Sequence, residues 1–133
     1  MEHFQYLKLE KIKMRIKTKD KKCRIIEDYN SPYTEPLFFK KNENVLIREK
    51  DSEWSGWIWC TNKSGQSRWI PENYLKINGN KGIIRQDYNA VELNVKIGEE
   101  YLIKNEEAEW YWVTNQEGKS GWVPIKNVMI IEK

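Results

Sequence analysis

A tryptophan-rich pattern occurs twice in this chain, first over residues 57–71 and again over residues 110–124. Laid over each other without a gap, the two copies share the residue pairs Trp57/Trp110, Trp59/Trp112, Thr61/Thr114, Asn62/Asn115, Gly65/Gly118, Trp69/Trp122 and Pro71/Pro124. Self-similarity of this density indicates a duplicated structural unit. The chain is therefore expected to contain two small domains of the same kind.

Each copy is typical of a β-hairpin, because an aromatic and β-branched run is followed by a polar turn with glycine and a second run that ends at proline. Side chains alternate between the two faces of a strand, so Trp57 and Trp59 share one face while Ile58 and Cys60 share the other. The interior of a barrel of roughly 55 residues accepts only modest side chains. We therefore expect the tryptophan face to point outward, and the inward residues to be Cys60, Ile70, Val113 and Val123.

The segments around each hairpin resemble the SH3 domain, in particular its bacterial variant type. Asp28-Tyr29 and Asp87-Tyr88 match the opening strand of the family, 37–43 and 93–99 match its diverging turn, and 71–75 matches its Pro-x-Asn-Tyr turn. The resemblance covers 23–76 and 82–131 and implies an all-β fold. It predicts two tandem five-stranded barrels packed closely, joined by the linker 76–81 and preceded by a short basic extension, residues 1–22.

The resemblance also implies a binding function, since SH3 domains hold proline-rich peptides across grooves walled by aromatic side chains. Glu27 replaces one tyrosine of the family motif, and Pro36 replaces the usual acid of the RT loop, the long loop after the first strand. The matching positions are Tyr29, Trp57, Pro71, Asn73 and Tyr74 in the first barrel and Tyr88, Trp110 and Pro124 in the second. Glu35 and Glu92 are the candidate ligand-binding acids of the RT loops, and Trp59 and Trp69 extend the outer face.

The two barrels are expected to be unequal. The position of Tyr74 falls within 125–128 of the second copy, where we expect an inserted residue and find no aromatic. We therefore predict that the first barrel carries the ligand site and that the second supports it. Trp59 and Trp69 could instead pack on strand neighbours or on the other barrel.

The charge distribution leaves two other functions open. Of the net charge of +3, residues 1–22 carry +5 and the remainder −2. A basic arm can bind nucleic acid or an anionic lipid surface, although a solvated tail is the simpler and favoured explanation of these charges. A cell-wall-binding SH3-like module is a third reading. The first 22 residues contain no apolar stretch of signal-peptide length, which disfavours export and makes a cytoplasmic location the expectation.

Catalysis and metal binding find little support in the composition. The single histidine is His3, and the cysteines Cys23 and Cys60 form no spacing motif. A nucleophile–histidine pair cannot be assembled within the repeats, and the thiols and remote imidazole do not make a zinc set. We therefore expect a non-enzymatic protein or peptide-binding module without a cofactor or metal.

Overall fold

The computed structural model describes residues 20–48 and 55–131, and this part of the chain holds strands and two short 3₁₀ helices but no α-helix. The all-β prediction is confirmed. Within the described residues, no helix is long and apolar enough to cross a membrane. Predictions that fall on residues 1–19 lie outside the described part.

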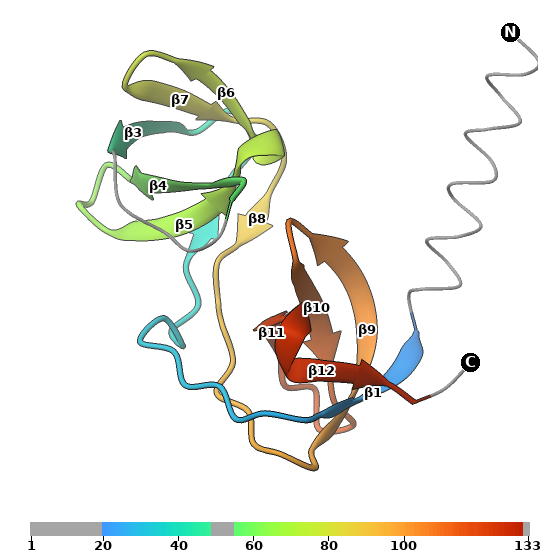
Figure 1. The fold of residues 1–133 in the computed structure, drawn as a ribbon. Coiled ribbons are helices and arrows are strands. Elements are labelled where there is room, and N and C mark those ends of the chain that lie inside the picture. The colour runs from blue at the N-terminus through green and yellow to red at the C-terminus, as the bar shows by residue number, and fades with distance from the viewer. Residues whose placement is uncertain (1–19, 49–54, 132–133) are drawn as a thin grey trace, which may run out of the picture. The chain divides into compact units, whose positions relative to one another are not determined.

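The chain divides into two compact units that differ from the predicted boundaries. Ser31–Leu93 forms one unit, here called the inserted unit. The other, here called the split unit, combines Met1–Asn30 with Asn94–Lys133. The sequential division into 23–76 and 82–131 is therefore wrong, because the first strand of each barrel belongs to the other unit. Figure 1 shows the blue N-terminal strand beside the red C-terminal one.

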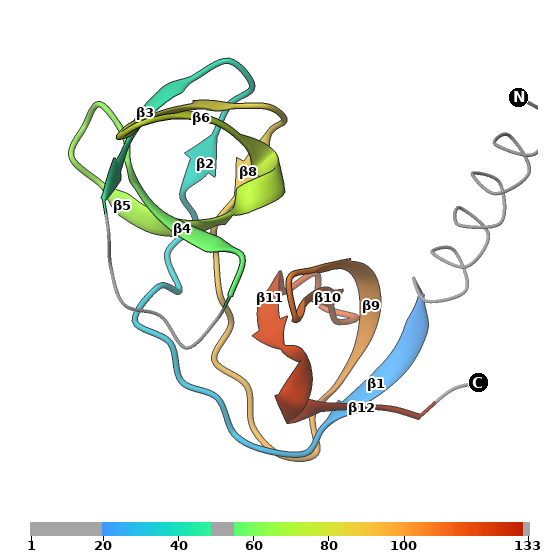
Figure 2. The same ribbon diagram turned by 45° about the horizontal axis from the view of Figure 1, so that its top comes forward.

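The inserted unit contains a five-stranded antiparallel sheet in the order β5-β4-β3-β7-β6. Figure 2 shows these strands curling into a ring. A short pair, β2 with β8, lies outside this sheet and joins Phe38 to Asn89 and Phe39 to Tyr88. The elements are β2 (Phe38–Phe39), β3 (Asn44–Arg48), β4 (Trp57–Thr61), β5 (Ser67–Pro71), η1 (Glu72–Tyr74), β6 (Leu75–Asn78), β7 (Lys81–Ile84) and β8 (Tyr88–Asn89).

A tight turn explains why the inserted unit keeps β7. Strands β6 and β7 pair directly, with Asn78 opposite Lys81, so that only Gly79 and Asn80 connect them. Gly79 has φ of +63°, which glycine adopts at little cost. Closing so short a loop costs far less entropy than pairing with a distant strand. The segment 76–81, predicted to link two barrels, is instead the centre of a hairpin within one.

The split unit contains a matching sheet in the order β11-β10-β9-β1-β12. Strand β1 begins at Lys21, so Lys21 and Lys22 belong to the barrel and not to the predicted extension. The elements are β1 (Lys21–Ile25), β9 (Glu100–Glu107), β10 (Trp110–Thr114), β11 (Ser120–Pro124), η2 (Ile125–Asn127) and β12 (Val128–Ile130). A bulge between Trp112 and Val113 interrupts the pairing of β10 with β9.

The predicted inward residues of both hairpins are confirmed. Cys60, Ile70, Val113 and Val123 are all 0% exposed. Their burial agrees with strand alternation, which turns these modest side chains of each hairpin toward the barrel interior. The prediction that the hairpin tryptophans point outward holds only in part. Trp57, Trp59, Trp69 and Trp112 are half-buried, whereas Trp110 and Trp122 are each 4% exposed.

Candidate functional site

The inserted unit carries a cluster of partly exposed aromatic side chains on its hairpin. Trp59 of β4 lies directly opposite Trp69 of β5, and their rings meet edge to face with centroids 5.0 Å apart. Tyr33 approaches Trp59 from the segment before β2, at 5.8 Å. Trp57 shares the outward face of β4 with Trp59. We call Tyr33, Trp57, Trp59 and Trp69 the aromatic face; all four are half-buried.

Three predicted site residues lie in the interior of the inserted unit. Tyr74 and Tyr88 are 7% and 5% exposed, and their rings pack edge to face at 5.1 Å. The Tyr88 hydroxyl donates to the backbone carbonyl of Trp69 at 3.4 Å. Pro71 is fully buried at the end of β5. These side chains support the hairpin that presents the aromatic face.

Two chain segments that correspond to the arms of an RT loop border this face. The amide of Glu92 donates to the carbonyl of Tyr33 at 2.9 Å, and the Ser31 hydroxyl donates to the Glu92 carboxylate at 2.7 Å. Glu35 is exposed, as is Asn73 in η1. The arms thus hold Tyr33 beside the hairpin and leave the Glu35 carboxylate accessible.

Tyr33 and Arg68 are site residues that the sequence reasoning missed. The Arg68 guanidinium lies 5.3 Å from the centroid of the Tyr33 ring, in a cation–π contact. It also donates to the carbonyls of Ser67, at 3.0 Å, and Glu35, at 3.5 Å. The sequence did offer two signals for them: Tyr33 is an aromatic residue in the expected RT loop, and Arg68 is a cation directly before Trp69.

Each predicted first strand lies in the opposite unit, and this strand exchange changes which predicted groove residues lie together. Tyr29 was expected beside Trp57, and Tyr88 beside Trp110. Instead the Tyr29 ring meets Trp110 edge to face at 5.6 Å, and Tyr88 belongs with Tyr74 and Trp69. Glu92, expected in the second barrel, also lies in the inserted unit. These groupings were wrong because the segments that contain Tyr29 and Tyr88 complete the opposite hairpins.

The split unit has a polar side chain at the position of the buried Tyr74 ring. Its helix η2 follows Pro124 as η1 follows Pro71, and both have the same length, so the predicted insertion is absent. Asn127 occupies the position of Tyr74. It is 2% exposed, and its amide donates to the carbonyls of Glu27 and Asp28, each at 3.1 Å. Pro124 is fully buried. With Trp110 buried as well, this unit offers less aromatic surface than the inserted unit.

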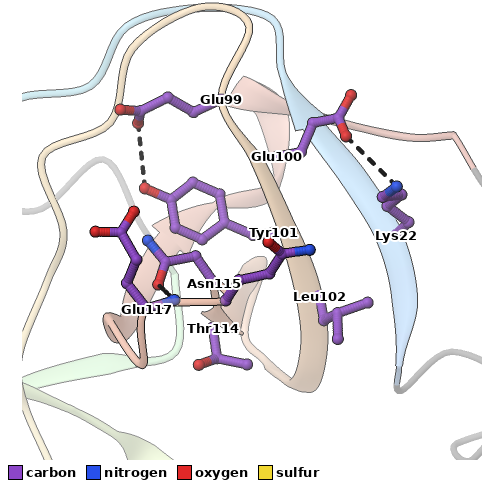
Figure 3. A pocket seen from close by; sticks show the side chains of 9 residues that line it. Lys22, Glu99, Glu100, Tyr101, Leu102, Thr114, Asn115 and Glu117 are labelled. Carbon is purple, nitrogen blue, oxygen red and sulfur yellow. Dashed lines mark hydrogen bonds and ion pairs between the residues drawn. The ribbon is translucent and has the colours of Figure 1, made fainter.

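A separate cavity of about 460 Å³ opens on the split unit between β1, β9 and the turn after β10. Figure 3 shows Glu99 and Glu117 near the hydroxyl of Tyr101. That hydroxyl donates to Glu99 at 3.1 Å, and burial, together with the Glu99 carboxylate, raises the pKa of Tyr101. Glu100 accepts from Arg24 at 2.8 Å, and this hydrogen bond lowers the pKa of the Glu100 carboxyl.

Within the described residues, no group of three or more His, Cys, Asp or Glu side chains is placed to hold a metal ion. Burial raises the pKa of the Cys23 thiol to about 11 and that of Cys60 to about 12. Both thiols therefore stay protonated near neutral pH and are poor nucleophiles or metal ligands.

Residues 22–88 match the variant SH3 domain family. The chain belongs to that family. SH3 domains are protein-interaction modules, and they are typically not catalytic. A stretch of 56 residues is 38% identical to part of the Myosin IB heavy chain of Dictyostelium discoideum. The stretch covers 42% of this chain but only 5% of that myosin, so the similarity is limited to a small part of the larger protein.

Proposed function

We propose that this chain is a non-enzymatic module that binds an extended peptide segment across the aromatic face of the inserted unit. The observation that carries the proposal is the half-exposed Trp59–Trp69 pair with Tyr33 beside it. Adjacent aromatic rings of this kind form the ridges between which a polyproline II peptide lies. Such a peptide is extended before it binds and loses little conformational entropy. A proline-containing segment is the ligand class that fits best.

Charged groups near the aromatic face would set the orientation of the peptide. Glu35 is exposed close to Arg68, whose guanidinium is already engaged with Tyr33 and two backbone carbonyls. The exposed carboxylate of Glu35 therefore favours a basic residue next to the prolines of the ligand. Asn73 is exposed on η1 and can donate to a peptide carbonyl.

We further propose that the split unit is a second SH3-like barrel whose role is mainly support. It repeats the strand order of the inserted unit, in which β1 takes the place of β7. Trp110 and Trp122 are almost fully buried, whereas the corresponding Trp57 and Trp69 of the inserted unit are half-buried. An anchor ring contributes much of the binding free energy in such grooves, so the split unit is expected to bind peptide weakly.

The proposal can be tested with a peptide array of proline-rich sequences, with and without a flanking arginine, followed by titration of the best binder. The control peptide has the same composition in scrambled order. Trp59→Ala should weaken binding by about 2 kcal/mol, or roughly 30-fold. Trp112→Ala is the matched control, because Trp112 occupies the same hairpin position in the split unit and is also half-buried.

Binding that survives Trp59→Ala, or that falls equally with Trp112→Ala, would contradict this assignment of the site. The titration should also be repeated at several salt concentrations. Peptide binding on an aromatic face changes little with salt, whereas nucleic-acid binding through a basic arm would weaken steeply.

A further inference from the structure

The two candidate first strands are similar enough that each could complete either barrel. Residues 23–29 and 82–88 align without a gap and both end in Asp-Tyr. Their contacts also correspond. Asp28 accepts the amide of Ile97, and Asp87 accepts the amide of Lys41, at 2.7 Å and 2.8 Å. The inward residues Ile25 and Ile84 are both 0% exposed. Backbone pairing and these side chains alone do not select a barrel.

We propose that three local features assign each first strand to its barrel, so that the chain adopts the exchanged topology and not two barrels in sequence. These features are the two-residue turn between β6 and β7, the size of residues 23 and 82, and the charge on the outer face of β1. The inference concerns the fold of the whole chain and does not depend on the proposed peptide site.

The turn favours the exchange because β6 and β7 are neighbours in the chain. With only Gly79 and Asn80 between them, these strands pair as a hairpin before any distant strand must be found. In a sequential arrangement, β6 would instead pair with residues 21–25, which lie about 50 residues away along the chain. Local closure therefore commits 81–84 to the inserted unit.

The side-chain volume at the equivalent positions 82 and 23 also favours the exchanged topology. Gly82 is buried opposite Val45, and a Cβ atom there would lie 3.1 Å from Cδ1 of Ile47 and 3.3 Å from Cγ2 of Val45. Gly82 has no positive φ, so this glycine provides space and not conformational freedom. The equivalent residue in the split unit is Cys23, which is 0% exposed opposite Tyr101. Exchanging the strands would crowd Ile47 and leave a void beside Tyr101.

The third feature is an ion pair on the outer face of the split unit. Arg24 lies opposite Glu100, and its guanidinium meets the carboxylate at 2.8 Å. In the inserted unit the corresponding pair is Ile83 opposite Asn44. A sequential arrangement would place Arg24 opposite Asn44 and Ile83 opposite Glu100, which removes the ion pair. This exposed ion pair contributes little stability, but it forms only in the exchanged topology and not in the sequential one.

Disulfide trapping in the full chain can report which topology forms. Lys22 lies opposite Leu102 in the exchanged form, whereas in a sequential form Lys22 would lie opposite Leu46. All three side chains are exposed. Their replacement removes the 3.6 Å Lys22–Glu100 ion pair from both reporters but leaves the Arg24–Glu100 pair intact. The two reporters are Lys22→Cys with Leu102→Cys and, as the matched control, Lys22→Cys with Leu46→Cys. The native thiols are buried and protonated, so they do not compete near pH 8.

In the otherwise unchanged chain, mild oxidation should cross-link most of the monomer through residues 22 and 102 and very little through residues 22 and 46. Intact mass spectrometry at low protein concentration separates intrachain from interchain products. Prominent cross-linking of 22 to 46 in this background would overturn the exchanged topology itself.

The proposed assignment of first strands to barrels is then tested in a variant that removes the short turn and the size difference. It combines Cys23→Gly, Gly82→Ala and a flexible insertion of about eight residues between Gly79 and Asn80. Cross-linking of 22 to 46 should rise at least 10-fold, and cross-linking of 22 to 102 should fall. Where the combined variant loses its folded circular dichroism spectrum, the insertion alone is used, and the 22–46 product should still increase. No increase in a folded variant would show that the turn and the side-chain volumes at residues 23 and 82 do not assign the strands.

Discussion

At the scale of single residues, the small inward side chains of the two hairpins determine how well each barrel packs. Ile70 is 0% exposed in the centre of the inserted unit. Ile70→Ala should lower the free energy of unfolding by about 2–4 kcal/mol, because it removes buried methyl groups and leaves a cavity. Urea denaturation followed by tryptophan fluorescence measures the change. Lys63→Ala, in the exposed turn of the same hairpin, should stay within about 0.5 kcal/mol of the native value.

The buried thiol of Cys60 makes stability depend on pH in the alkaline range. Burial raises its pKa from 9.0 to about 12 in the folded chain. Above pH 9 the unfolded chain loses this proton while the folded chain keeps it, so the contribution is complete below pH 9 and disappears as pH rises toward 12. The unfolding free energies of native protein and Cys60→Ala should therefore converge above pH 9. A constant difference between them up to pH 11 would contradict this.

Residue burial was predictable where strand alternation alone decides it. Cys60, Ile70, Val113 and Val123 followed from the hairpin pattern and are buried. The burial of Trp110 was not predictable in this way, because one of its contacts is the ring of Tyr29, which lies in a distant segment of the chain. Periodicity gives the face of a strand but not what covers that face.

At the scale of elements, Asn127 fastens η2 to the segment that follows β1. Its amide donates to two backbone carbonyls, and the amide of Ile26 donates to the Asn127 carbonyl at 2.8 Å. Asn127→Ala should cost about 1–3 kcal/mol, because the two backbone carbonyls lose the donor that this buried side chain supplies. Hydrogen exchange of the Ile26 amide should accelerate more than that of Ile84 in the inserted unit. Equal acceleration at both amides would mean that Asn127 has no local role.

The elements themselves were largely predictable, but their partners were not. The sequence indicated the two strands and the turn of the hairpin over 57–71 because alternation and turn residues are local signals. Asn78-Gly79, within the predicted linker 76–81, is a dipeptide that favours a turn. The resemblance to sequential SH3 domains led us to place that turn between two barrels, whereas it closes a hairpin within one. The candidate site residues were chosen by matching their positions to the SH3 family. Because that match assumed two sequential barrels, Tyr29 and Tyr88 were assigned to the wrong hairpins.

At the scale of the whole molecule, the inserted unit is continuous in sequence and the split unit is not. All strands of the inserted unit lie within Ser31–Leu93, whereas the split unit needs residues on both sides of it. Within the inserted unit, the turn at Gly79 joins β6 directly to β7. Domain boundaries drawn by analogy with a sequential pair would cut through both units.

The continuity of the inserted unit predicts which fragment of the chain folds by itself. A fragment of residues 31–93 retains β7 and β8, including the buried side chains of Ile84 and Tyr88. It should unfold cooperatively in urea and retain the Trp59–Trp69 pair. A fragment of residues 23–76 has similar length but lacks β7, so the edges of β3 and β6 lose their partner strand. It should lack a cooperative transition, because unpaired edges and an open core leave too little buried surface. The opposite result, with 23–76 cooperative and 31–93 unfolded, would mean that the first strand completes the hairpin that follows it directly.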